Sequence, residues 1–66
     1  MSSILTPFER DLLKLVAEGL TNKEIGERVD KSWRTVGNHL QRAFIKLDAL
    51  NRVQAVNEAR SRGEIE

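Results

Sequence analysis

The side chains best suited to binding chemistry gather in residues 32–47. Drawn as a helix with about 100° per residue, this segment has one polar side. That side carries cations and hydrogen-bonding groups and no acidic residue, and its members are Arg34, Thr35, Asn38, His39, Gln41, Arg42 and Lys46. A solvent-facing helix usually includes Glu or Asp, which pair with Lys or Arg one turn away. A side with hydrogen-bond donors and no anions therefore indicates a polyanionic ligand.

Residue types that support catalysis or metal binding are scarce. The chain has one histidine, His39, and no cysteine, which excludes a His/Cys metal site, a thiol nucleophile and a disulfide. It has no glycine-rich phosphate-binding loop, and a chain of 66 residues is too short to enclose a substantial pocket. We therefore expect no enzymatic activity, no cofactor, no metal ion and no small-molecule site.

The basic charge is concentrated around the same segment. The net charge is only +1, yet residues 1–30 hold four Lys/Arg against six Asp/Glu (net −2), whereas residues 31–66 hold seven against four (net +3). A local basic surface of this kind favours nucleic acid as the polyanion. No apolar run reaches the roughly 20 residues of a membrane span, and no signal peptide opens the chain. We therefore expect a cytoplasmic protein that does not bind a membrane.

Helix-start signals divide the chain into four helices. Each expected helix is preceded by a residue type that caps helix N-termini, and these residues are Thr6, Thr21, Ser32 and Asn51. Apolar residues recur between them at helical spacing, which predicts an all-α fold with helices at about 7–18, 22–29, 33–47 and 52–62. Residues 1–66 are expected to form one domain, with frayed ends at 1–4 and 64–66.

The second and third expected helices form a helix-turn-helix. Asp30 and Lys31 leave a short connection between them, in which Asp30 can take a left-handed conformation. Gly26 lowers helix propensity by about 1 kcal/mol, but its small size lets another helix cross closely. Trp33 falls on the apolar side of the third helix, so we expect it to be partly buried. Ile45 points to the polar side of the same helix.

Several linked motifs resemble the LuxR/FixJ/GerE-type DNA-binding domain. They are LTPFER (residues 5–10), EGLTNKEI (18–25), TVGNH (35–39), KL (46–47) and NRVQA (51–55), and the similarity runs from Leu5 to about Gly63. The resemblance implies a bacterial transcription regulator, of the kind found in response regulators, whose third helix enters the major groove of duplex DNA. It also implies a homodimer on DNA, RNA polymerase as a further partner, and association with the nucleoid.

Site residues follow from the resemblance and from side-chain type. Residues near the start of a recognition helix reach base edges, where Asn and Gln pair with adenine and Arg with guanine. We therefore predict base contacts from Arg34, Thr35, Gly37, Asn38 and Gln41. Phosphate contacts are predicted for Thr21, Asn22, His39, Arg42, Lys46 and Arg52, with a local hydrogen bond as the alternative for His39. Contacts between two copies are predicted for Leu50, Val53, Val56 and Asn57.

The chain departs from the family pattern in places that bear on affinity. Gly37 stands where the family usually has Lys, which removes one expected cation. Asp30 and Asp48 replace glycines, and Lys31 replaces an apolar residue. Gly37 and the low net charge leave open a helical protein interaction module that has lost DNA binding. A sigma factor region-four domain is another alternative, although the NRVQA motif favours the LuxR/FixJ resemblance.

Overall fold

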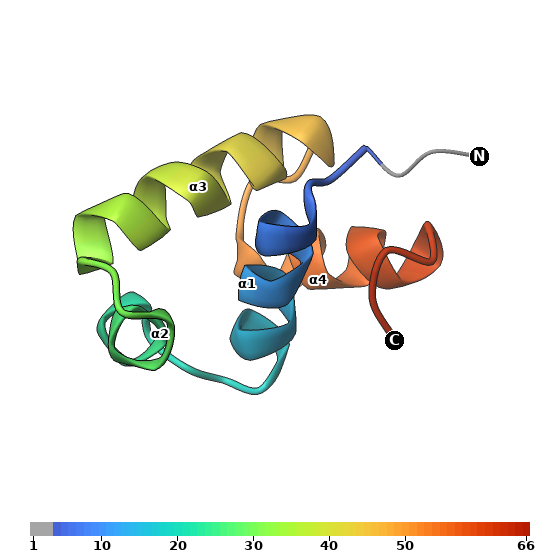
Figure 1. The fold of residues 1–66 in the computed structure, drawn as a ribbon. Coiled ribbons are helices and arrows are strands. Elements are labelled where there is room, and N and C mark those ends of the chain that lie inside the picture. The colour runs from blue at the N-terminus through green and yellow to red at the C-terminus, as the bar shows by residue number, and fades with distance from the viewer. Residues whose placement is uncertain (1–3) are drawn as a thin grey trace.

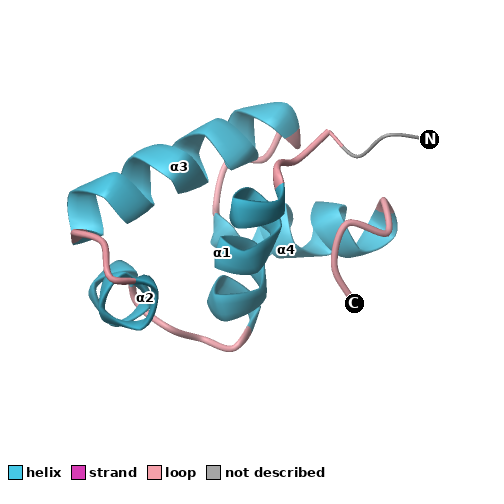
Figure 2. Ribbon diagram, in the orientation of Figure 1, coloured by secondary structure: helices cyan, strands magenta, loops and turns pink. Residues whose placement is uncertain are grey.

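Four helices and no strand are formed by residues 4–66, which are the residues described by the computed structural model. The helices are α1 (Pro7–Ala17), α2 (Asn22–Val29), α3 (Trp33–Lys46) and α4 (Arg52–Ser61) (Figure 1). Figure 2 shows that short loops join them. The predicted all-α fold is confirmed. The predicted helix ends at residues 18, 47 and 62 are each one residue too late, because Glu18, Leu47 and Arg62 are C-cap residues.

Local hydrogen bonds explain where each helix begins. In α1, the Glu9 backbone N–H donates to Thr6 Oγ1 at 3.1 Å, and the Thr6 N–H donates to Glu9 Oε1 at 2.8 Å. Thr21 and Glu24 form the same reciprocal capping box at the start of α2. Ser32 and Asn51 accept from the third residue of α3 and α4, respectively. The helix starts are thus determined by short sequence motifs.

The core is made by the inner sides of all four helices. The largest fully buried side chains are Leu12, Leu13, Ile25, Leu47 and Val36. In Figure 1, α1 occupies the centre, α3 crosses above it and α4 lies on its other side. α2 packs against the first half of α3. This packing presents the opposite side of α3 to solvent.

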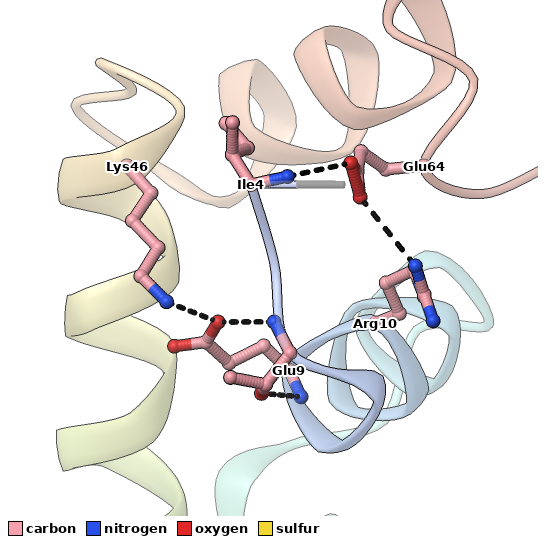
Figure 3. A network of polar contacts seen from close by, with 6 residues as sticks. Ile4, Glu9, Arg10, Lys46 and Glu64 are labelled. Carbon is pink, nitrogen blue, oxygen red and sulfur yellow. Dashed lines mark hydrogen bonds and ion pairs between the residues drawn. The ribbon is translucent and has the colours of Figure 1, made fainter. Parts of the chain in front are cut away.

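Fraying is predicted at 64–66, but Ile65 in this segment packs against the core. Ile65 is buried with the core, and the Glu64 backbone N–H donates to the Ala59 carbonyl at 2.8 Å. Glu64 Oε1 also accepts from the Ile4 backbone N–H at 3.2 Å (Figure 3). Of residues 1–4, for which fraying is also predicted, Ile4 therefore has a partner in the C-terminal segment, and residues 1–3 lie outside the described residues.

The helix-turn-helix connection depends on one close approach and one left-handed residue. Asp30 has φ +58°, as predicted, and the following Lys31 N–H donates to the Gly26 carbonyl at 2.8 Å. A Cβ atom on Gly26 would lie only 2.4 Å from the Lys31 carbonyl oxygen. The chain that crosses Gly26 is therefore the connection itself and not, as expected, another helix.

Trp33 is exposed, which contradicts the expected partial burial. Its side of α3 is apolar, but 57% of its surface remains accessible to solvent. Trp33 is the first residue of α3, whereas the buried residues begin one turn later at Val36. The helical angle placed Trp33 on the apolar side of α3, but it could not show that the neighbouring elements leave most of this side chain uncovered.

Candidate nucleic-acid interface

The outward side of α3 is polar and free of carboxylates. α3 has the sequence WRTVGNHLQRAFIK, which contains no Asp or Glu. Val36, Leu40 and Ala43 anchor the helix in the core, and the exposed polar residues on its other side are Arg34, Asn38, Gln41 and Arg42. The structure therefore brings most of the predicted base-contacting residues together on one accessible surface. We call this surface the outward side of α3.

The first turn of α3 is ordered by contacts between neighbouring side chains. Ser32 Oγ donates to Thr35 Oγ1 at 3.0 Å, which leaves the half-buried Thr35 hydroxyl able to donate to another group. The Arg34 guanidinium lies over the Trp33 ring, 5.3 Å from the ring centroid. Such a cation–π contact restricts a long side chain while leaving its N–H groups available.

Gly37, Asn22 and Arg52 come together although they belong to three different helices. A Cβ atom on Gly37 would lie 3.4 Å from Asn22 Nδ2. Arg52 Nη2 donates to Asn22 Oδ1, and Arg52 Nη1 donates to the Leu20 carbonyl at 3.2 Å. Arg52 is thus bonded to the segment between α1 and α2. No sequence pattern predicts this link, because Asn22 and Arg52 are 30 residues apart in the chain.

Lys46 is bound to a buried carboxylate. Its Nζ lies 2.7 Å from Glu9 Oε1, and the Glu9 side chain is only 4% exposed (Figure 3). Burial, the largest influence, opposes ionisation of Glu9. The hydrogen bonds from Lys46 and Thr6, together with the Lys46 charge, outweigh burial and lower the pKa of Glu9 below its ordinary value. This ion pair joins the end of α3 to the start of α1, so Lys46 already has a partner inside the protein.

The remaining predicted phosphate contacts differ in how accessible they are. His39 is half-buried, with its ring edge-to-face against Phe8 at a centroid distance of 5.0 Å. Thr21 is exposed while its hydroxyl accepts from the Glu24 N–H. Arg42 is exposed and forms no ion pair with any of residues 4–66. Of the predicted phosphate-contacting cations, Arg42 is therefore the most available to a ligand.

The predicted dimer contacts are split between surface and core. Leu50 is 88% exposed, Val53 is 71% exposed, and Asn57 is also exposed. Val56, by contrast, is 8% exposed and packs in the core of its own chain. The prediction for Val56 is therefore corrected: it is a core residue and exposes too little area to contribute much to a dimer contact. Beside Val53, a shallow hollow of about 290 Å³ runs between α1 and α4.

Residues 4–66 show neither a membrane-spanning helix nor a cluster of metal ligands. No helix in this part of the chain has the length and apolar character needed to cross a lipid bilayer. The same residues contain no group of three or more His, Cys, Asp or Glu side chains that could hold a metal ion.

Comparison with known proteins identifies the family. Residues 3–59 match the family of bacterial regulatory proteins, luxR family. Over 59 residues the chain is 52% identical to Mb0914c of Mycobacterium bovis, provisionally named an HTH-type transcriptional regulator, covering 89% of this chain and 7% of that protein. It is 47% identical over 51 residues to the Escherichia coli nitrate/nitrite response regulator protein NarL, covering 77% of this chain and 24% of that protein.

A solved structure agrees with the sequence comparison. The fold matches that of the transcription factor GerE with a TM-score of 0.92 and 32% identity, covering 98% of this chain and 97% of that one. The mycobacterial relative is far longer, since this chain spans only 7% of it. The comparisons confirm the predicted resemblance and describe DNA-binding regulators rather than enzymes. The chain belongs to the luxR family of bacterial regulatory proteins and is a helix-turn-helix DNA-binding domain.

Proposed function

We propose that the chain binds duplex DNA sequence-specifically by inserting the outward side of α3 into the major groove. The observation that carries this proposal is the exposure of Arg34, Asn38 and Gln41 on a helix without a carboxylate. Their spacing of four and three residues aligns them on one helix side. A row of this kind suits base edges, which offer both donors and acceptors in the major groove.

Phosphate contacts position the helix in this proposal. Arg42 and Thr21 are exposed, and Asn22 lies beside Gly37 at the edge of the outward side. Lys46 has a carboxylate partner, so its charge is partly neutralised. Among the predicted contacts, Arg34 and Arg42 are the exposed cations that form no ion pair within residues 4–66, so we expect modest affinity with a shallow salt dependence for a single domain.

Two copies would bind together on DNA through the start of α4. Leu50 and Val53 are large apolar side chains that lie close in the chain and are mostly exposed. Burying them against a second copy would remove apolar surface from water. Val53→Glu should leave the folded monomer intact and abolish cooperative binding to paired half-sites. Cooperative binding that survives this change would exclude Val53 from the contact.

Selection from a random duplex pool tests sequence recognition directly. The parent domain should enrich a short motif, in one copy or in a spaced pair. Asn38→Ala and Gln41→Ala should alter the enriched bases, whereas Arg42→Ala should weaken binding to every duplex and leave the motif unchanged. Absence of enrichment, together with absence of salt-sensitive binding at tens of micromolar protein, would exclude sequence-specific recognition by this domain.

A further inference from the structure

Arg52 does not point into solvent as a phosphate-binding arginine would. It is half-buried at the start of α4, and both terminal nitrogens of its guanidinium donate within the protein. One donates to the Leu20 carbonyl at 3.2 Å and the other to Asn22 Oδ1. The planar guanidinium therefore bridges a backbone oxygen and a side-chain oxygen at the start of α2.

This bridge fixes the orientation of the Asn22 amide. A guanidinium has only donors, so the Asn22 atom that faces it must be the carbonyl oxygen. The oxygen and nitrogen of an asparagine amide are otherwise hard to tell apart, and here the arginine decides between them. The Asn22 NH₂ group must consequently face away from Arg52.

The freed NH₂ group faces the outward side of α3. Asn22 Nδ2 lies where it would meet a Cβ atom of Gly37 at 3.4 Å. None of residues 4–66 accepts a hydrogen bond from Asn22 Nδ2, and the side chain is only half-buried. The two N–H donors of the uncharged Asn22 amide thus lie beside Gly37, the position where the family usually has a lysine.

We propose that Arg52 is a positioning residue that aims the Asn22 NH₂ group at a phosphate of bound DNA and does not itself contact phosphate. Amide side chains commonly donate to phosphate oxygens and fix the register of a protein on DNA. The inference rests on the proposed DNA binding and replaces the direct phosphate contact predicted for Arg52.

Four variants separate positioning from direct contact: Arg52→Lys, Arg52→Ala, Asn22→Ala and the double alanine variant. A lysine supplies the charge of a phosphate contact but cannot bridge two acceptors in a fixed plane. If Arg52 acts by positioning, Arg52→Lys should weaken binding as much as Arg52→Ala, by about three- to tenfold. The double variant should bind no more weakly than either single alanine variant.

The opposite pattern would overturn the inference. A direct phosphate contact predicts that Arg52→Lys binds like the parent, that the two alanine losses multiply, and that Arg52→Ala lowers the salt slope by about one. If the parent itself shows no salt-sensitive DNA binding, the proposed function and this inference both fail. If the parent binds DNA and the fold-losses of the two single alanine variants multiply in the double variant, this inference alone is overturned.

Side-chain amide NMR provides a second readout in folded protein. In the parent, the Asn22 NH₂ resonances should shift when a duplex is added, and in Arg52→Lys this shift should be lost. Circular dichroism of each variant verifies that the four helices are retained. A parent spectrum in which DNA leaves the Asn22 NH₂ resonances unmoved would also overturn the inference.

Discussion

The two helices of the helix-turn-helix each contain an internal glycine, and the surroundings of these glycines differ. A Cβ atom on Gly26 would meet three backbone atoms, the nearest being the Lys31 carbonyl oxygen at 2.4 Å. A Cβ atom on Gly37 would meet only one side-chain atom, Asn22 Nδ2, at 3.4 Å. Both glycines lower helix propensity by about 1 kcal/mol relative to Ala. Packing therefore explains why position 26 is a glycine, whereas packing at position 37 would also permit a larger residue.

The cations on and near α3 also fall into two groups: two are bound to other parts of the protein, and two are exposed to solvent. Lys46 and Arg52 are bound to Glu9, Leu20 and Asn22 and thereby hold the helices together. Arg34 and Arg42 are exposed on the outward side. Substitutions on the inner side should therefore change stability first, and substitutions on the outer side should change DNA binding first.

The largest effect is expected from Gly26→Ala. Its methyl group cannot be accommodated beside the Lys31 carbonyl, so the connection must move despite the better helix propensity of Ala. We expect a loss of about 2–3 kcal/mol of unfolding free energy and a melting temperature lower by roughly 10–20 °C. Thermal unfolding followed by circular dichroism measures this change. A melting temperature equal to that of the parent would show that position 26 tolerates a methyl group as well as position 37 does.

A smaller loss is expected from Glu9→Gln, which keeps an acceptor for the capping box but removes the ion pair with Lys46. At pH 7 we expect a loss of about 1–2 kcal/mol. The pKa of Glu9 is lowered in the folded state, so its contribution is complete above pH 4.5 and declines as the pH falls through the lowered value.

The pH dependence of that difference is the sharper measurement. Parent and Glu9→Gln should converge in stability as the pH is lowered towards 3. Glu24, whose pKa is lowered by hydrogen bonds with Thr21, is present in both proteins, so it does not affect the comparison. A stability difference that stays constant from pH 7 to pH 3 would show that the charge of Glu9 is irrelevant.

The smallest effects are expected at Gly37, and they separate folding from binding. Gly37→Ala should raise the unfolding free energy by about 0.5–1 kcal/mol, because the position is helical and has space for a methyl group. Gly37→Lys should in addition strengthen DNA binding by about fivefold, with a steeper salt dependence. Fluorescence anisotropy of a labelled duplex at two salt concentrations measures binding. Equal affinities of the lysine and alanine variants would contradict a cation site at this position.

Local chemistry made most of the fold predictable. Capping residues such as Thr6 and Thr21 act on backbone groups three residues away, so their effect can be derived from a short segment. The same holds for the left-handed Asp30, and the amphipathic pattern of α3 correctly separated Val36 and Leu40 from the polar residues.

Contacts between distant segments could not be predicted in this way. The Glu9–Lys46 pair joins residues 37 positions apart, and no local pattern distinguishes a lysine with such a partner from a free one. Burial of Ile65 depends on the same kind of tertiary packing. The sequence therefore identified which side chains could bind DNA but not which of them the fold already uses. The DNA contacts themselves remain predictions.

The pairing of Ile4 with Glu64 determines how this domain can be connected to other polypeptides. Both ends of the described chain meet on the side of the molecule opposite to α2 and the beginning of α3 (Figure 1). The same proximity makes the domain suited to circular permutation, since a short linker could join its ends without unravelling a helix.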